Sequence, residues 1–176
     1  MAGSTTFLPS ADDYAAAMML SYRRNLRSAR FWRFSIGLSL LAAAGMGVWF
    51  ASLSGDPGDF LIYFPIGLAG AALGILLCHL LALPFARGRS DKLYRQQRSL
   101  HHETGFAWDA GGTQWKSPTG EGQFRWEEHH RFAAGRASLL LYLNEGLFHF
   151  VPLRALDAGQ REDLLATIAA SGLRRA

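Results

Sequence analysis

The stretch that decides the fold is FSIGLSLLAAAGMGVWFASL, residues 34–53, which contains no Lys, Arg, Asp or Glu. A second stretch without these residues, FLIYFPIGLAGAALGILLCHLLALPFA, covers residues 60–86. Each is long enough, as an α-helix, to cross about 30 Å of hydrocarbon. In the second stretch, Pro65 suits a first helical turn and Pro84 marks the far end. The sequence therefore predicts a two-helix transmembrane hairpin with spans at 34–53 and 65–85.

Basic residues flank this hairpin on both outer sides. Those before the first span are Arg23, Arg24, Arg27, Arg30 and Arg33, and those after the second are Arg87, Arg89, Lys92, Arg95 and Arg98. The connecting loop contains Asp56, with Asp59 just beyond it, and no basic residue. Because cytoplasmic flanks carry the excess of Lys and Arg, both chain ends are expected in the cytoplasm and the short loop outside.

The basic excess of the chain lies next to the spans. The formal net charge is +4 and the pI about 9.6, but residues 99–176 carry nearly equal numbers of acidic and basic residues. This distribution favours attraction to anionic headgroups of the lipid bilayer and argues against a nucleic-acid partner. The single cysteine, Cys78, lies inside a span, so no intrachain disulfide can form.

Four segments follow from this pattern. Residues 1–33 are expected to form a cytoplasmic amphipathic lead helix that starts at Ser10, a favourable N-cap. Residues 34–86 form the hairpin. Residues 87–98 are a basic juxtamembrane linker, and residues 99–176 are a cytoplasmic β domain that ends in a helix.

The last segment predicts an α+β class, since short alternating strands precede an amphipathic helix. Strands are expected at 104–108, 113–116, 124–132, 139–143 and 147–153, all antiparallel, with a helix capped by Asp157 and Gln160. The expected domain core consists of Phe106, Trp108, Phe124, Trp126, Phe148, Phe150, Pro152, Leu164, Leu165 and Ile168.

Three motifs in this domain carry a family resemblance. They are Trp126-Glu127, Leu141-Tyr142-Leu143 and the run Phe150-Val151-Pro152-Leu153-Arg154-Ala155-Leu156 that leads into the helix. With the two preceding spans, the chain resembles the YcxB-like family of bacterial membrane proteins over about residues 10–170. The resemblance implies a bacterial cytoplasmic (inner) membrane location and a small pleckstrin-homology-like domain. The family supplies no catalytic residues to carry over.

Small residues recur every fourth position in both spans, which keeps each set on one helix stripe. The stripes are Ser39, Ala43, Gly47 and Ala51 in the first span and Gly70, Gly74, Cys78 and Ala82 in the second. Close backbone approach holds membrane helices together, so the stripes are expected to pack within one chain. The alternative is that the second stripe faces another copy in a homodimer. His79 is expected to make a hydrogen bond between the helices.

The histidine pairs are the best candidates for chemistry. His102, Glu128 and His130 share one strand face, and suitable pairing would give a three-ligand zinc site with an open position. Their spacing matches no established metal motif, so ordinary interfacial histidines are the favoured reading. We expect no catalytic residues and no cofactor.

The sequence thus favours a membrane-anchored, non-catalytic binding or regulatory module that presents its cytoplasmic domain to an unidentified protein or lipid partner. The alternative is a metal-dependent membrane enzyme that uses His102, Glu128 and His130. A binding or regulatory module requires a recognition surface and no cluster of catalytic side chains. A metal-dependent enzyme requires the side chains of His102, Glu128 and His130 to lie close together.

Overall fold

The computed structural model describes residues 3–176 and divides the chain into two compact units. The second unit is Arg24–Ala86, and the first combines the chain up to Arg23 with Arg87–Ala176. The chain therefore does not run through a lead, a hairpin, a linker and a domain in series. Both flanks of the apolar hairpin return to one folded unit, so the hairpin is an insertion within that unit.

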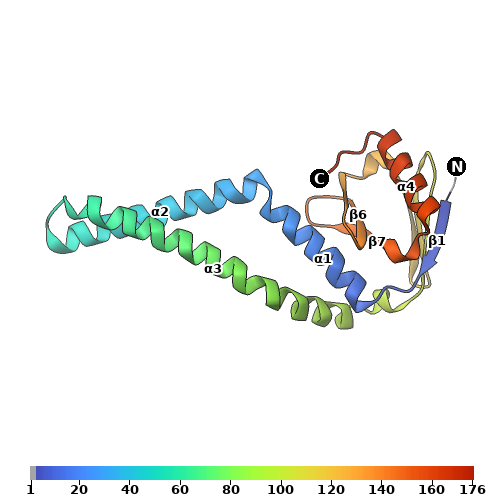
Figure 1. The fold of residues 1–176 in the computed structure, drawn as a ribbon, viewed down its shortest axis with the longest axis horizontal. Coiled ribbons are helices and arrows are strands. Elements are labelled where there is room, and N and C mark those ends of the chain that lie inside the picture. The colour runs from blue at the N-terminus through green and yellow to red at the C-terminus, as the bar shows by residue number, and fades with distance from the viewer. Residues whose placement is uncertain (1–2) are drawn as a thin grey trace. The chain divides into compact units, whose positions relative to one another are not determined.

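The second unit is a pair of helices. α2 spans Ala29–Ser54 and α3 spans Asp59–Gln96, and they run in opposite directions (Figure 1). Gly55 closes α2 with a left-handed φ of 73°, a conformation that favours glycine at a helix end. By length and composition, Ala29–Ser54 and Asp59–Ala82 are apolar enough to cross a membrane.

The second apolar helix is longer at both ends than the sequence predicts. α3 begins at Asp59, so Pro65 lies inside the helix and not in its first turn. The helix also continues past Pro84 to Gln96, so most of the expected basic linker 87–98 is helical. A proline inside a helix removes one backbone hydrogen bond, which does not have to end the helix. The Arg, Lys, Leu and Gln residues between Pro84 and Gln96 are good helix formers, so the helix continues through them.

The two helices pack through one face of α2. Ser35, Ser39, Ala43 and Gly47 are buried there, and the Phe50 ring stacks on Tyr63 with 4.1 Å between centroids. A Cβ on Gly67 of α3 would lie 3.1 Å from the Cα of Ala43.

The expected stripe on α3 does not face α2. A Cβ on Gly70 or on Gly74 would meet nothing within 4 Å, and Cys78 is exposed. Positions spaced by four drift around the axis by about 40° per step, so spacing alone cannot distinguish neighbouring stripes of one helix. The α3 face toward α2 instead includes Gly67 and His79, whose ring lies 5.2 Å from Phe31.

We predict that Gly67→Leu disrupts the hairpin, because the added side chain would be forced against the backbone of α2 at Ala43. The expected cost is about 1–3 kcal/mol, as for other overpacked sites. The measurement is the fraction of detergent-solubilised protein that resists trypsin. Gly70→Leu is the matched control, and an equal loss in both variants would contradict the observed packing.

The first unit contains two antiparallel sheets. Sheet A has the order β1 (Gly3–Phe7), β2 (Thr104–Trp108), β3 (Gly112–Ser117), β4 (Gly120–Arg125). Sheet B has the order β5 (Arg131–Ala134), β6 (Ser138–Tyr142), β7 (Phe148–Pro152). Helix α1 (Ala11–Leu26) follows β1, and α4 (Ala158–Ala170) ends the domain with the Asp157–Gln160 capping box. Three short 3₁₀ turns cover Arg98–His101, Trp126–Glu128 and Leu153–Ala155.

β1 is the element that the sequence analysis missed. The lead was expected to be helical, but Gly3–Phe7 is an edge strand, labelled β1 in Figure 1. It pairs with β2, and Thr5 lies opposite Phe106. The segment is short, and its Gly, Ser and Thr residues give little hydrophobic alternation. Its partner lies about a hundred residues further along the chain, so no local signal announces the pairing.

The expected third strand, 124–132, is two strands joined by a turn. β4 ends at Arg125, and Trp126–Glu128 form the 3₁₀ turn before β5. The Glu128 carboxylate accepts a hydrogen bond from the backbone N–H of Arg125 at 2.7 Å, which stabilises the turn. The strand-face assignment of His130 therefore fails, because the chain changes direction between Trp126 and His130.

The core lies between the sheets and α4. Its main cluster contains Phe106, Trp108, Trp126, Leu164 and Ile168, with Phe124 and Leu165 packed against it. A second cluster contains Phe150, Tyr142 and Ala17, with Phe148 at its margin, and Pro152 is fully buried. The residues expected in the core therefore all contribute to it. Ala17 shows that α1 also packs on the domain.

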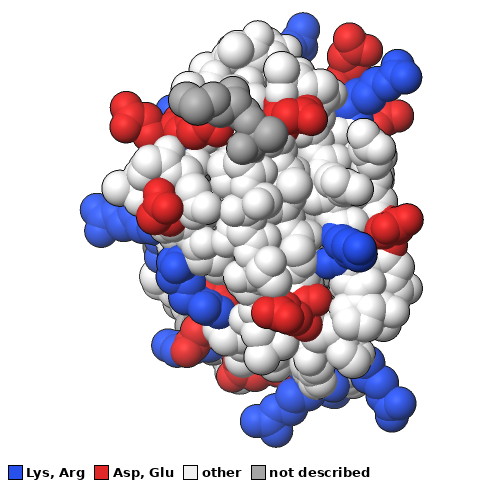
Figure 2. Space-filling view, turned by 90° about the vertical axis from the view of Figure 1, so that its right-hand side faces the viewer, with Lys and Arg blue, Asp and Glu red and all other residues white. Residues whose placement is uncertain are grey.

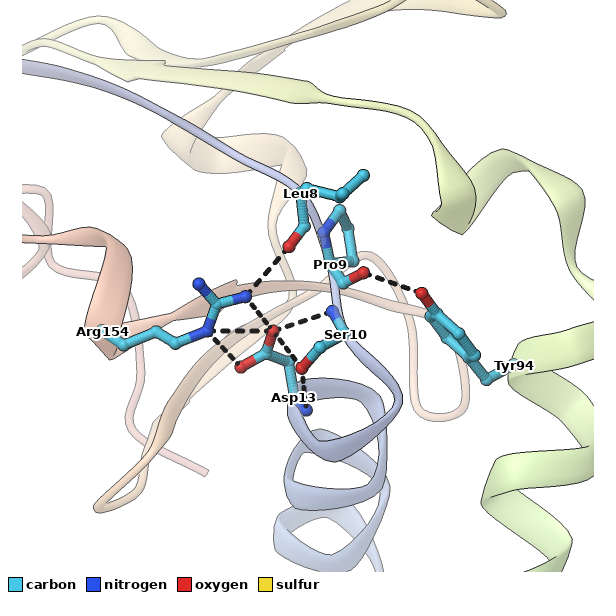
Figure 3. A network of polar contacts seen from close by, with 6 residues as sticks. All are labelled: Leu8, Pro9, Ser10, Asp13, Tyr94 and Arg154. Atoms are coloured by element: carbon cyan, nitrogen blue, oxygen red, sulfur yellow. Dashed lines mark hydrogen bonds and ion pairs between the residues drawn. The ribbon is translucent and has the colours of Figure 1, made fainter.

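A network of polar contacts ties the start of α1 to the domain (Figure 3). The Arg154 guanidinium donates to both carboxylate oxygens of Asp13 and to the Leu8 carbonyl at 2.9 Å. Ser10 donates to Asp13, and the Tyr94 hydroxyl donates to the Pro9 carbonyl at 2.9 Å. Burial alone would raise the pKa of Asp13, but the hydrogen bonds from Arg154 and Ser10 outweigh burial and lower it.

Candidate functional site: a cleft between the sheets

The three residues of the hypothetical metal site do not converge. His102, Glu128 and His130 are all exposed, and Glu128 is engaged in its own turn. Within residues 3–176, no three His, Cys, Asp or Glu side chains are grouped closely enough to hold a metal ion. The geometry that the enzyme hypothesis requires is therefore not found in the described part of the chain.

The buried histidine of this region is His129, which sequence reasoning did not single out. One ring nitrogen, Nε2, lies 3.0 Å from the Thr113 hydroxyl, and its ring lies 5.9 Å from the Trp126 ring. Burial, aided by the nearby His149 and opposed by the Glu128 charge, lowers the pKa of His129 to about 4. His129 is therefore neutral at pH 7.

We predict that acid destabilises the domain through His129. Its pKa is lower in the folded state than the ordinary value of 6.5, so the unfolded chain binds more protons between about pH 6.5 and 4. The stabilisation of the folded domain by neutral His129 is complete above pH 6.5, and it falls by about 3 kcal/mol at most as the pH approaches 4. The measurement is the urea midpoint of the full chain in detergent at pH 7 and pH 5. His129→Gln should reduce this dependence to the part that the buried His149 contributes, whereas the exposed His102→Gln should leave it unchanged.

The first unit contains a cleft of about 660 Å³. Its walls come from β3 and β4, from β7, and from α1 with the short turn after α3. The side chains are mainly apolar or aromatic and include Tyr14, Met18, Trp115, Phe124, Phe148 and Phe150. The cleft therefore opens beside the core, between one edge of each sheet.

Two glycines of β4 line this cleft. Gly122 lies opposite Trp115 in the β3–β4 register, and Phe124 lies opposite the buried Thr113. Side chains alternate along a strand, so Gly120, Gly122 and Phe124 share the inward face. A Cβ on Gly120 would meet nothing within 4 Å, whereas one on Gly122 would lie 3.1 Å from the Phe124 ring. Open space is therefore found at Gly120, and at Gly122 the Phe124 ring already fills the position of a side chain.

Two polar groups interrupt the apolar wall. Trp115 is 8% exposed, and among the described residues its Nε1–H has no hydrogen-bond acceptor. His149 lies against Trp115 and Phe124, with ring centroids 4.8 Å and 5.3 Å away. Burial lowers the pKa of His149, so its imidazole is neutral at pH 7. The wall thus contains two uncharged polar side chains, and the Trp115 Nε1 atom is itself buried.

Charge around the cleft is balanced. Lys116 and Glu121 line its margin and lie opposite each other across β3 and β4. The face shown in Figure 2 likewise carries acidic and basic side chains in a mixed arrangement around a largely uncharged middle. Neither surface forms a single-sign field of the kind that steers charged partners.

The cleft could not be anticipated from residue types alone. Its wall is built from residues that also form the core, and one side is supplied by α1, whose packing on the domain is long-range. The glycine alternation at residues 120 and 122 is the one local signal, because glycine is unfavourable inside a strand without a structural reason.

These observations define the class of protein: an α+β chain in which two long apolar helices are inserted into a small, two-sheet β domain. The family model described as YcxB-like protein matches residues 108–168. The resemblance stated from the motifs is thus confirmed for this part of the chain, which is similar to the YcxB-like family. The match runs from the end of β2 into α4, a narrower range than the expected 10–170. No curated protein and no solved structure matches the chain.

Proposed function

We propose that this chain is a membrane-anchored, non-catalytic binding or regulatory module of the bacterial cytoplasmic membrane. It is a multi-pass protein with both termini in the cytoplasm and the short loop Gly55–Gly58 outside. Two apolar helices and the basic residues that flank them support this arrangement. The lipid bilayer is then one partner, and the domain binds a second.

The pairing of β1 with β2 carries the proposal. Residues 3–7 and 104–108 lie in one sheet, so they must be on the same side of any membrane. Both apolar helices lie between them, and two crossings return the chain to the side it left. The strand pairing and the arginine distribution are independent, and they support the same topology.

A pleckstrin-homology-like domain is part of the proposal. Four-stranded and three-stranded antiparallel sheets followed by a C-terminal helix support it. The cleft supports a binding role because it combines a concave apolar wall with a few polar groups, as ligand sites do. We also propose a second copy of this chain as a partner. A Cβ on Gly70 or Gly74 would meet nothing within 4 Å, so the α3 surface there has room for another helix.

Reporter fusions test the topology. A reporter that works only in the cytoplasm should be active when fused after Ala176, and one that works only outside should be active within Gly55–Gly58. The reverse pattern would overturn the proposal. Alkaline carbonate should leave the chain in the membrane fraction, whereas release into the supernatant would contradict anchoring by spans.

Metal analysis tests the non-catalytic role. Purified wild type should contain no stoichiometric zinc, and the His102→Ala and His130→Ala variants should behave like it. Stoichiometric zinc that is lost from both variants would contradict the proposal and favour a metal-dependent enzyme.

A further inference from the structure

The chain itself covers one outer edge of each sheet. At the β1 edge of sheet A, the Gln160 side chain donates a hydrogen bond to the Ser4 carbonyl at 2.9 Å. At the β5 edge of sheet B, the Phe132 N–H donates to the Arg174 carbonyl at 3.0 Å, and the Phe132 carbonyl accepts from the Ala176 N–H at 2.8 Å. Sheet B therefore already accepts one extended segment, the end of the chain, through backbone hydrogen bonds.

The other edge of sheet B, formed by β7, is open. The Leu143 N–H donates to the Leu147 carbonyl, so these two residues are a hydrogen-bonded pair of the β6–β7 hairpin. Such pairs alternate along an antiparallel ladder, and the N–H and C=O groups of Phe148 and Phe150 therefore point away from β6. In the described part of the chain, no hydrogen-bond partner is found for these groups. An edge of this kind is a template for another extended segment.

The cleft runs along this open edge. Consecutive residues of β7 and its turn, 146–150, all line it. Side chains alternate between the two faces of a strand, so consecutive residues line one cleft only where it follows the strand edge. Glu121 of β4, the open edge strand of sheet A, lines the cleft as well. The Arg125 N–H bonds to Glu128 and so points away from β3, and by alternation the backbone groups of Glu121 do the same.

The side chains beside the β7 edge are apolar or uncharged on both faces of sheet B. On one face the Phe150 ring lies 6.1 Å from the Tyr14 ring of α1. On the other face the neutral His149 lies against Trp115 and Phe124. An added strand alternates its own side chains between these two walls, so its residues should be apolar. A lipid chain would fill the same space but would leave the backbone groups of β7 without partners.

We propose that the cleft binds an extended apolar segment of a partner protein, which adds to the open edge of β7 as a further strand of sheet B. The segment forms backbone hydrogen bonds with Phe148 and Phe150, and it matches the five residues of β7 in length. The inference rests on the proposed binding role, and it identifies the second partner of the module as a protein.

The test uses the full chain in phosphatidylcholine nanodiscs and a capped synthetic peptide. The peptide has a central run of alternating valine and leucine, as long as β7, between a terminal lysine and a terminal glutamate. At saturating peptide, hydrogen exchange of the Phe148 and Phe150 amides should slow about tenfold or more, because each gains an acceptor. The Phe132 amide, which already bonds to Arg174, is the internal control and should not change.

A second peptide tests the backbone directly. It has the same side chains, but every nitrogen of the central run is methylated, so it has no N–H to donate. About tenfold more of this peptide should be needed for the same protection, as expected for one or two lost hydrogen bonds. This comparison uses the wild-type chain, so it does not depend on the folding of any variant.

Phe148→Pro removes one outward N–H of β7, and Phe148→Ala is the matched control because it loses the same ring and keeps the N–H. Proline is compatible with a strand position whose N–H points away from the sheet, and Pro152 occupies such a position in β7. The proline variant should need about tenfold more peptide than the alanine variant for equal protection of the Phe150 amide.

Three results would overturn the inference. They are unchanged exchange at Phe148 and Phe150 with saturating peptide, equal potency of the two peptides, and protection without peptide in nanodiscs that hold two copies. The last result would assign the edge to a second copy of this chain. None of them would affect the reporter and zinc experiments, which test the topology and the non-catalytic role separately.

Discussion

Trp126→Ala should lower the free energy of unfolding of the domain by about 3–5 kcal/mol, much of the stability of a small domain. The side chain is 5% exposed and belongs to the cluster between the sheets and α4. Its Nε1–H also donates to the Asp109 carbonyl at 2.9 Å, so truncation leaves both a cavity and an unpaired acceptor.

Hydrogen exchange of the β6 amides in the full chain measures this loss, because exchange of central strands reports global opening of the domain. Trp126→Phe should cost less, since it keeps most of the ring and loses only the hydrogen bond and some volume. The exposed neighbour Glu127→Ala should change stability by less than about 0.5 kcal/mol. Unchanged exchange in Trp126→Ala would show that the tryptophan does not support the core.

Arg154→Ala should be the second large effect, with a loss of about 2 kcal/mol. The substitution leaves the Asp13 carboxylate, whose side chain is only 10% exposed, without its charged partner. It also removes the hydrogen bond to the Leu8 carbonyl, which fixes the connection between β1 and α1. The estimate is below that for a fully buried pair, because Arg154 is half-exposed and solvent screens its charge.

The pH dependence separates this contribution from packing. The pKa of Asp13 lies below its ordinary value of 3.8, so the stabilisation is present above that value and is lost as the pH falls through the lowered pKa. The urea midpoints of wild type and Arg154→Ala should therefore converge in strong acid. Arg161→Ala, an exposed arginine on α4, is the control and should match wild type at every pH. A constant difference between wild type and Arg154→Ala at all pH values would mean that the loss is not electrostatic.

Local signals made part of this fold predictable. The apolar helices are long and free of charge, and the Asp157–Gln160 capping box marks the start of α4 within a few residues. The inward aromatic residues of β2 and β7 alternate as strands require. These features depend on neighbours in the sequence, so residue patterns contain them.

The remaining features depend on contacts between distant segments. β1 has no amphipathic pattern, and only its pairing with β2 makes it a strand. The contact face of α3 centres on Gly67 and not on Gly70, because the neighbouring helix selects among several small-residue stripes. His129 and His130 follow the turn at Trp126–Glu128, and after this turn His129 is buried and His130 is exposed. The cleft is lined by glycines of β4 together with α1, which joins the domain from the other end of the insertion.

The central claim is that a two-span hairpin is inserted between two paired strands of one domain, and a single cross-link tests it. Ser4 and Ala107 are opposite each other in the β1–β2 register, so cysteines at both positions can form a disulfide. In membranes that contain the Cys78→Ser chain with Ser4→Cys and Ala107→Cys, mild oxidation should link the two positions within one chain. Cysteines at Ser4 and Gln123 should not link, since three strand spacings of about 4.8 Å separate β1 from β4. An absence of the 4–107 link, or links only between chains, would contradict the account.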